Sequence, residues 1–247
     1  MDRPISIPDE LVSLLQEARH VAVLTGAGVS AESGVPTFRD AQTGLWAKYN
    51  AEELATPQAF RRDPKLVWDW YAWRRQLVSQ ADPNPGHHAL VELANRVPRL
   101  TLITQNVDGL HQCAGSHDVV ELHGSITRIV CSHDRRVAET WPETDDVPRC
   151  ADCNNYLRPD VIWFGESLPA QALQRAFQAA EKCDLFLSIG TSALVHPAAS
   201  LPFAALEHRI PTVEINPDAT PLTRHATFVL QGPSGQILPA LVASLKT

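Results

Sequence analysis

The segment GAGVSAESGVPTFRD, residues 26–40, contains the residue types that can surround a pyrophosphate group. Gly26, Gly28 and Ala31 satisfy the G-x-G-x-x-G/A spacing, in which the glycines permit a tight turn and bring backbone N–H groups close to phosphate oxygens. The segment directly follows HVAVLT (20–25), an apolar run typical of a strand. This arrangement predicts a phosphate-binding turn, although ordinary structural turns also produce such triplets.

A second polar group, TQNVDGLH (104–111), lies at the end of the strand-like run LTLITQ (100–105). The Asn106 amide can hydrogen-bond to a carboxamide or a ribose hydroxyl, and the Asp108 carboxylate can accept hydrogen bonds from an amide NH2 group. Taken alone, these two residues are also consistent with capping of the helix that follows.

His123 comes directly after the run DVVEL (118–122) and before Gly124. The unperturbed pKa of an imidazole suits proton transfer near neutral pH. Its place at the end of a strand makes His123 the candidate general base.

The elements that must position these residues alternate between strands and helices. Further strand-like runs cover 184–190, 211–216 and 226–231, and helical patterns cover 86–95, 170–182, 197–208 and 235–245. This alternation predicts an α/β fold with a Rossmann-like, mainly parallel sheet and helices on both faces. No strand is expected between 36 and 97, where an ordinary dehydrogenase would complete its first βαβ unit.

Two segments depart from the alternation. Residues 40–85 have helical periodicity, and residues 126–160 read as irregular and contain cysteines. We expect a single catalytic domain over 1–247, with a Rossmann-like large part at about 10–39, 86–125 and 161–247. The smaller module, helical and zinc-ribbon-like, is expected at about 40–85 and 126–160, over the sheet edge where α/β proteins bind ligands.

Composition excludes several classes of protein. With 247 residues and 44% hydrophobic content, the chain can bury a sizeable core. A net charge of −7 argues against a nucleic-acid-binding surface, which requires clustered Lys and Arg. The N-terminal segment lacks the layout of a secretory signal, and no run reaches membrane-spanning length. We expect a soluble cytoplasmic protein whose five cysteines are thiols or metal ligands, with Cys113 and Cys183 as buried thiols.

The chain closely resembles the sirtuin family of NAD-dependent protein lysine deacylases in the order of its motifs. These are GAGVSAES, TQNVDGLH and HG, followed by GTS at 190–192 and VEIN ending at Asn216. The resemblance extends over roughly residues 10–240. It implies that NAD is consumed as a co-substrate and that acyl-lysine proteins or peptides are the partners. Around the NAD phosphates, riboses, nicotinamide and adenine it places Gly26, Ala27, Gly28, Ser30, Ala31, Thr37, Phe38, Arg39, Gln105, Asn106, Asp108, Gly190, Thr191, Ser192, Asn216 and Ser234.

The resemblance also implies a reaction. The acyl-lysine carbonyl oxygen attacks the nicotinamide ribose and expels nicotinamide. His123 then acts as general base on a ribose hydroxyl, which leads to free lysine and O-acyl-ADP-ribose. Asn106 and Asp108 would line the nicotinamide pocket, and Thr37 and Phe38 would lie in the loop that closes over the reacting centre.

A Tyr-x-x-Arg pair in the inserted helical segment bears on the acyl group. Tyr71 and Arg74 lie three residues apart and therefore on one face of a helix. Periodicity alone favours a Trp-anchored amphipathic helix with a solvated arginine. The resemblance instead points to the subgroup (class III) that removes malonyl, succinyl or glutaryl groups, with Ala55 leaving room for the longer chain. It also places the substrate peptide along Val161, Trp163, Phe164 and Gly165.

The cysteines of residues 131–153 offer an incomplete metal signature. Cys150 and Cys153 form a C-x-x-C pair, but the expected second cysteine near Cys131 is missing. The sequence offers His133 or Asp134 in its place. Two alternatives remain open: a structural Cys3His zinc site completed by His133, or an incomplete or metal-free site.

Two alternative functions also remain open at this point. One is the transfer of ADP-ribose to a protein side chain, and the other is an NAD-responsive binding protein without catalysis. His123 argues against the second, because NAD binding alone does not require a base.

Overall fold

Six parallel strands form the main sheet, in the order β3-β2-β1-β6-β7-β8. The computed structural model describes residues 5–36, 49–142 and 144–245. Its central strands, β1 and β6, are buried along their whole length, as expected for a parallel sheet covered on both faces. The strands are β1 (Val21–Thr25), β2 (Leu100–Thr104), β3 (Val120–Glu121), β6 (Leu185–Ile189), β7 (Thr212–Asn216) and β8 (Phe228–Gln231).

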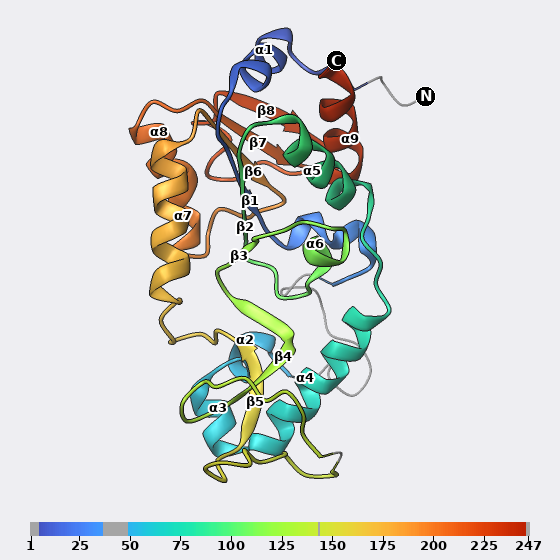
Figure 1. Ribbon diagram of the computed structural model, residues 1–247, viewed down its shortest axis with the longest axis vertical. Coiled ribbons are helices and arrows are strands. Elements are labelled where there is room, and N and C mark those ends of the chain that lie inside the picture. The colour runs from blue at the N-terminus through green and yellow to red at the C-terminus, as the bar shows by residue number, and fades with distance from the viewer. Residues whose placement is uncertain (1–4, 37–48, 143, 246–247) are drawn as a thin grey trace.

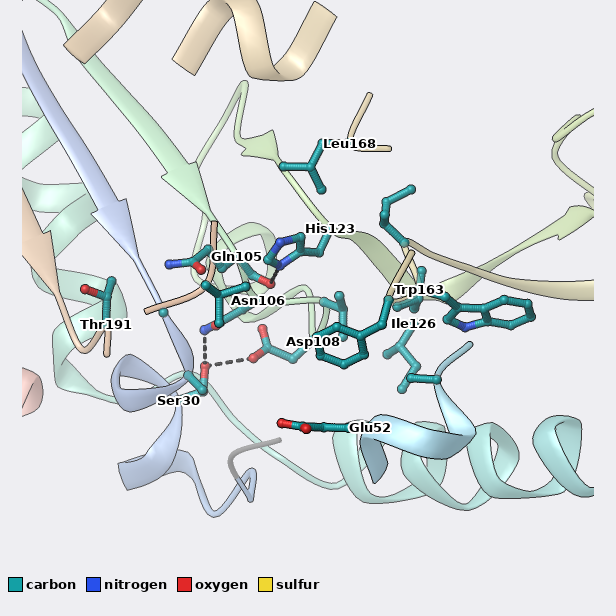
Figure 2. A pocket seen from close by; sticks show the side chains of 18 of the residues that line it. Ser30, Glu52, Gln105, Asn106, Asp108, His123, Ile126, Trp163, Leu168 and Thr191 are labelled. Atoms are coloured by element: carbon teal, nitrogen blue, oxygen red, sulfur yellow. Dashed lines mark hydrogen bonds between the residues drawn. The ribbon is translucent and has the colours of Figure 1, made fainter. Parts of the chain in front are cut away.

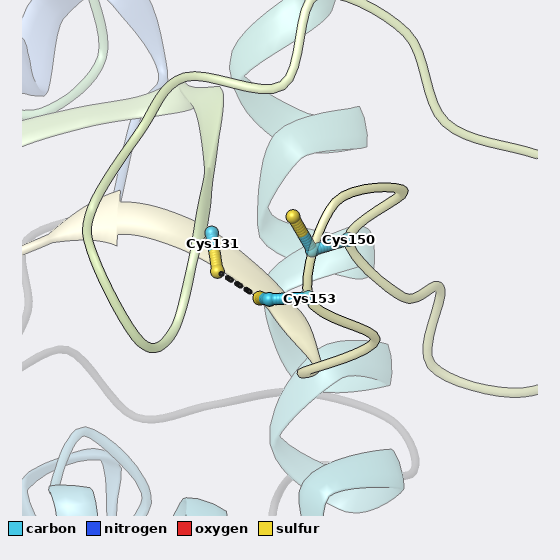
Figure 3. Close-up of side chains that lie close together, drawn as sticks. All are labelled: Cys131, Cys150 and Cys153. Atoms are coloured by element: carbon cyan, nitrogen blue, oxygen red, sulfur yellow. Dashed lines mark hydrogen bonds between the residues drawn. The ribbon is translucent and has the colours of Figure 1, made fainter.

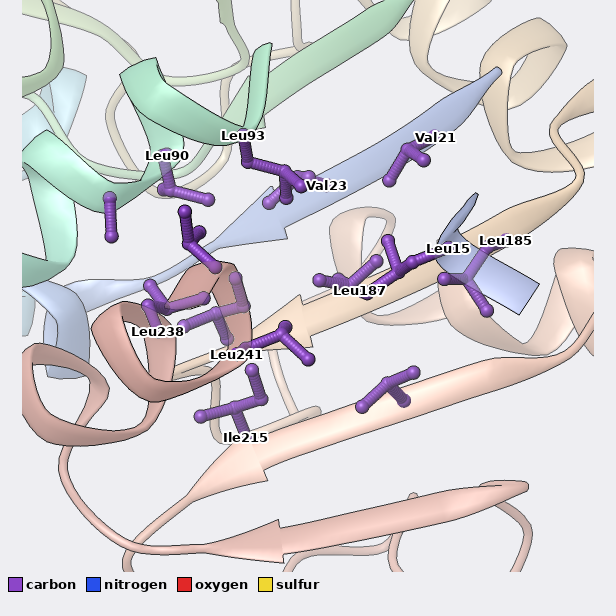
Figure 4. Close-up of a cluster of buried hydrophobic side chains, with 14 of the residues drawn as sticks. Leu15, Val21, Val23, Leu90, Leu93, Leu185, Leu187, Ile215, Leu238 and Leu241 are labelled. Atoms are coloured by element: carbon purple, nitrogen blue, oxygen red, sulfur yellow. The ribbon is translucent and has the colours of Figure 1, made fainter. Parts of the chain in front are cut away.

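Helices cover both faces of this sheet (Figure 1). One face packs against α1 (Asp9–Glu17), α5 (Pro85–Arg96) and α9 (Ser234–Ser244), whose leucines meet the valines and leucines of β1 and β6 (Figure 4). The other face packs against α7 (Ala170–Lys182) and α8 (Leu201–Glu207), largely through alanines. The predicted Rossmann-like arrangement is confirmed.

A smaller module with its own core lies at the other end of the molecule (Figure 1). It contains α2 (Ala51–Leu54), α3 (Pro57–Arg62) and α4 (Pro64–Ser79), together with the antiparallel strands β4 (Gly124–Cys131) and β5 (Leu157–Val161). Thr56 caps α3 and Asp63 caps α4, in each case followed by a proline at the first helical position. Two separate stretches of chain therefore build this module.

The prediction that residues 126–160 are irregular was partly wrong, because β4 and β5 pair there. Pro159 and the charged residues Arg158 and Asp160 obscured β5 in the sequence. Their charges are compensated: Arg158 pairs with Glu166, and Asp160 pairs with arginines of the same module. Cys183 is buried as predicted, whereas Cys113 is exposed.

Short helical turns complete the chain: η1 (Ala27–Val29), η2 (Ala31–Ser33), α6 (Leu110–Cys113) and η4 (Ala198–Ser200). Within the described residues, no strand lies between β1 and β2, as predicted. Among these residues, too, no helix has both the length and the apolar character needed to cross a membrane.

The sheet has a topological switch point at β1. Strand β1 pairs with β2 on one side and with β6 on the other. Ligands of open α/β sheets bind outside the carboxyl ends of strands at such a point. The glycine turn after β1 lies at this position.

Candidate functional site

A cavity of about 770 Å3 lies between the carboxyl edge of the main sheet and the smaller module. Its volume is in the range of small-molecule sites. Figure 2 shows His123, Asn106 and Asp108 between Thr191, at the end of the main sheet, and Trp163 with Ile126, in the smaller module. Residues from the ends of β1, β2 and β6 therefore share one cavity with residues of α4 and of the segment after β5.

Three glycines bring the loops after β1 and β6 into direct contact. A Cβ atom on Gly28 would lie 2.7 Å from the Gly190 Cα atom, and one on Gly26 would lie 2.7 Å from the Gly190 carbonyl oxygen. Gly190 has φ +60, a conformation that favours glycine. The Gly28 N–H donates to the Gly190 carbonyl oxygen at 2.9 Å. The glycines of this motif therefore allow the loops after β1 and β6 to pack directly against each other.

Ser30 joins the two polar motifs. Its hydroxyl donates to Asp108 Oδ2 at 2.8 Å and accepts from the Asn106 side-chain amide at 3.0 Å (Figure 2). The other carboxylate oxygen of Asp108 accepts from the Leu110 N–H, so the capping interpretation also holds. Burial raises the pKa of Asp108, although these hydrogen bonds act in the opposite direction. The network fixes the orientation of both side chains at the cavity wall.

His123 lies at the centre of the cavity with one defined tautomer. Its Nδ1 lies 2.9 Å from the Gln105 carbonyl oxygen, which can only accept, so Nδ1 carries the proton. Burial lowers the pKa of His123. A neutral ring protonated on Nδ1 leaves the Nε2 lone pair available, which is the state a general base requires.

Two further histidines lie behind this site, and sequence reasoning missed them. His87 and His111 are almost fully buried, with ring centroids 4.9 Å apart. His87 Nδ1 accepts from the Asn84 N–H in the capping box of α5, and His87 Nε2 lies 3.5 Å from the Ser30 hydroxyl. The sequence signal was the Asn-Pro-Gly-His order of a capping box, in which the histidine occupies the third helical position.

The smaller module supplies the other end of the cavity. Tyr71 and Arg74 of α4 both line it, as do Ala55, Val161, Trp163, Phe164 and Gly165. The Tyr71 phenol accepts a hydrogen bond from Trp163 Nε1 at 3.0 Å. The Arg74 guanidinium lies over the Trp70 ring, and burial lowers the pKa of Arg74. This end of the cavity therefore combines apolar side chains with the Arg74 guanidinium and the Tyr71 phenol.

Most predicted contacts line the cavity, but three do not: Ala31, Asn216 and Ser234. The Asn216 amide donates to the Thr191 carbonyl oxygen, and the Ser234 hydroxyl donates to Glu32. Thr37, Phe38 and Arg39 fall outside the described residues. The cavity also contains residues that the sequence did not single out, among them Glu52, Leu168 and His196.

The sulfur atoms of Cys131, Cys150 and Cys153 lie within 4.8 Å of one another (Figure 3). The Cys131 and Cys153 sulfur atoms are 3.4 Å apart. The side-chain hydrogen bond from Asn155 lowers the pKa of Cys153 to about 7, which favours the thiolate that zinc binds. Within the described residues, the exposed His133 ring is not part of this cluster. Three thiols fit a zinc ion with the fourth position left to another donor.

Comparison with known proteins connects this geometry to one family. Residues 26–197 match the family model described as "Sir2 family". A protein of Methylococcus capsulatus named NAD-dependent protein deacylase is 51% identical, over 96% of this chain and 97% of its own length. The crystal structure of a Sir2 homolog–NAD complex matches with a TM-score of 0.90 at 44% identity, over 99% and 96% of the two chains. A complex of Sir2 with a p53 peptide and NAD+ matches with a TM-score of 0.85 at 31% identity, over 96% and 98%.

Proposed function

Because the chain belongs to the Sir2, or sirtuin, family, we propose that it removes acyl groups from protein lysines at the expense of NAD. The acyl groups would include malonyl, succinyl and glutaryl as well as acetyl, and the products would be nicotinamide, deacylated lysine and O-acyl-ADP-ribose. One observation carries the proposal: the glycine loops, His123 and the Tyr71–Arg74 pair line a single cavity. The relatives named above are NAD-dependent deacylases or form NAD complexes, which supports the same reaction.

The loops after β1 and β6 would hold NAD. A Cβ atom on Gly26 or Gly28 would collide with the loop after β6, so the absence of side chains there suits the close approach of a pyrophosphate, and Thr191 and Ser192 line the cavity beside these glycines. When bound, NAD supplies a ribose carbon whose bond to nicotinamide is broken. Asn106 and Asp108, fixed through Ser30, would line the nicotinamide end. Thr37, Phe38 and Arg39 are proposed as further contacts on the strength of the family resemblance.

His123 would remove the proton from a ribose hydroxyl. The Gln105 carbonyl holds the ring in the Nδ1-protonated tautomer, and burial keeps it neutral at pH 7. Both conditions favour Nε2 as the base. The chain itself therefore provides the proton acceptor that the deacylation requires.

The Tyr71–Arg74 pocket would select acyl groups that end in a carboxylate. Arg74 and Tyr71 lie on one face of α4 and both line the cavity, and burial lowers the pKa of Arg74. The carboxylate of an acidic acyl group would accept charge-assisted hydrogen bonds from Arg74 and Tyr71, which an acetyl group lacks the oxygens to accept. The backbone N–H of Phe164 donates to the Ala55 carbonyl oxygen, which ties the peptide-binding segment to this pocket.

The substrate peptide would lie along the segment after β5. Phe164 is exposed, and no atom other than those of the glycine itself and its chain neighbours lies within 4 Å of the position that a Cβ on Gly165 would occupy, so a peptide can approach both residues. Ser192, Val195 and His196 line the same cavity from the loop after β6, and Leu194 of that loop is exposed. Recognition through backbone pairing would read the peptide sequence weakly. We propose that the protein acts on cytoplasmic acyl-lysine proteins.

The test uses peptides of one sequence that carry acetyl-, malonyl- or succinyl-lysine, incubated with the protein and NAD. We expect nicotinamide and O-acyl-ADP-ribose, detected by mass, to form in proportion to deacylated peptide. Arg74→Met should lower kcat/KM for the succinyl peptide at least about tenfold, the value of one charged hydrogen bond, with a much smaller effect on the acetyl peptide. Arg75→Met is the matched control, because the neighbouring Arg75 packs over Trp68 and does not line the cavity.

Three results would contradict this proposal in different ways. If no product forms with any peptide, the deacylase proposal fails. If ADP-ribose becomes attached to the peptide instead, the activity is ADP-ribosyl transfer. If Arg74→Met weakens turnover of all peptides equally, deacylation stands but the arginine does not select the acyl group.

A further inference from the structure

Arg158 is a buried cation that does not line the cavity, although it lies on β5 next to the cavity wall. Its side chain is only 5% exposed. Two of its nitrogens bind the two carboxylate oxygens of Glu166, at 2.7 and 2.9 Å, and Nη2 also donates to the Val161 carbonyl oxygen. A forked pair of this kind fixes the plane of the guanidinium.

That plane lies against the indole ring of Trp163. The Arg158 Cζ atom is 3.3 Å from the ring centroid, in a cation–π contact. Glu166 Oε2 accepts the backbone N–H of the same tryptophan at 2.8 Å. The ion pair therefore holds Trp163 both through its ring and through its backbone.

Trp163 in turn sets the hydrogen-bonding role of Tyr71. An indole N–H can only donate, so the Tyr71 oxygen must be the acceptor in their 3.0 Å hydrogen bond. Burial raises the pKa of Tyr71 to about 12, so the phenol keeps its own proton at neutral pH. With one acceptor site of its oxygen occupied by Trp163, the O–H remains as the donor that Tyr71 can offer to a ligand in the cavity it lines.

We propose that the Arg158–Glu166 ion pair is a positioning device for acyl selectivity, which acts through the Trp163 indole to direct the Tyr71 O–H toward the carboxylate of an acidic acyl group. This inference rests on the proposed function, since it concerns which acyl-lysine the same cavity prefers. Trp163 and Tyr71 touch the substrate, whereas Arg158 acts only through them. A purely structural role for the ion pair would alter stability or overall rate but not the choice between acyl groups.

The experiment compares kcat/KM for succinyl- and acetyl-lysine peptides of one sequence and reports their ratio for each variant. Both peptides are assayed with the same enzyme preparation. A partial loss of folded enzyme therefore lowers both kcat/KM values equally and leaves their ratio unchanged. Trp163→Phe keeps an aromatic ring but removes the indole N–H and reduces the size of the ring system, so its effect is interpreted together with that of Arg158→Lys and with the Tyr71→Phe background. Arg158→Lys keeps the charge and removes the fork and the planar face. Arg149→Lys is the control, since Arg149 belongs to the same module but lies over the Tyr156 ring and does not line the cavity.

We expect Trp163→Phe and Arg158→Lys each to lower the succinyl-to-acetyl ratio several-fold, and Tyr71→Phe to lower it about tenfold. In the Tyr71→Phe background neither change should lower the ratio further, because the hydroxyl through which they act is gone. Arg149→Lys should leave the ratio unchanged.

An unchanged ratio in Trp163→Phe or Arg158→Lys, with wild type still preferring succinyl-lysine, would overturn the inference and leave the deacylase function intact. An equal reduction in the Tyr71→Phe background would overturn it as well, since the effect would not pass through Tyr71. Absence of turnover by wild type would refute the proposed function, and this inference with it.

Discussion

His123 Nδ1 donates to the Gln105 backbone carbonyl oxygen across 2.9 Å, which fixes the tautomer of the histidine that lies beside the predicted nicotinamide residues. Because a backbone carbonyl cannot change its hydrogen-bonding role, this orientation does not depend on the protonation of a neighbouring side chain. Gln105 ends the run that positions Asn106 and Asp108. The same turn therefore orients both the proposed base and the residues expected at the leaving group.

Replacement of the base should slow the reaction far more than it weakens binding. We expect His123→Ala to lower kcat by about 100-fold or more, the usual contribution of a general base, while the affinity for NAD changes little. Single-turnover rates and NAD titration by calorimetry would separate the two effects. His117→Ala, which alters an exposed histidine, serves as the control. A full rate in His123→Ala would show that another group accepts the proton.

The pH dependence of the rate should reflect the depressed pKa of His123. Burial places this pKa below the usual value of about 6.5, so the neutral form persists further into the acidic range. We expect kcat/KM to be flat from about pH 7 to pH 8 and to fall only below about pH 6.5. Initial rates in buffers of constant ionic strength test this. An acidic limb above about pH 7 would mean that the folded protein raises the pKa instead.

The buried histidine pair should make the protein labile to acid. Burial lowers the pKa of His87 to about 4 and that of His111 to about 3. Below about pH 6.5 the unfolded chain therefore binds protons that the folded chain does not, and the free energy of unfolding falls by up to about 1.4 kcal/mol per pH unit for each ring. The stability that the two neutral rings contribute is fully present above about pH 6.5. It is lost as the pH falls toward about 4 for His87 and about 3 for His111, their pKa values in the folded protein.

Urea unfolding at several pH values between about 7 and 5 would measure this slope. His111→Gln should reduce the slope because it removes one titrating group, and the exposed His117→Gln should not. An identical slope in His111→Gln would show that other groups cause the acid lability.

The sequence predicted best those features whose residues lie close together along the chain. The glycine turn, the residues after β2 and the proposed base His123 each lie in a short motif next to a strand, and such local patterns indicate which residues end up at the same edge of the sheet. The contact between Tyr71 and Trp163 joins residues from different elements of the smaller module, and no periodicity encodes it. The same holds for Gly190, whose role depends on the pairing of β1 with β6.

The charged residues of β5 illustrate a second limit. Arg158 reads as a surface residue because burial of a cation is costly without a partner, and the partner, Glu166, lies beyond the end of the strand. Only the folded arrangement shows that the cost is compensated. The cysteine cluster was predicted in part: the sequence placed the three thiols together but did not settle the fourth donor.

The cysteine cluster should bind zinc if it has the role that its geometry supports. Elemental analysis of purified protein is expected to find about one zinc ion per chain, the content of a single structural site. Cys153→Ser should lose the metal and lower the Tm by at least about 4 °C, whereas Cys113→Ser, which alters an exposed cysteine elsewhere, should retain it. Zinc well below stoichiometry in the wild-type protein would favour the metal-free alternative.

The interlocked glycines have a consequence for biosynthesis. The turn at Gly26 and Gly28 emerges from the ribosome early, but the loop that completes it, at Gly190, is translated only after most of the main sheet and the entire smaller module. A nascent chain that stops before β6 would lack half of the cradle and one neighbour of β1. Affinity for the dinucleotide should therefore arise late in translation, which makes ligand binding a marker of completed synthesis rather than an early aid to folding.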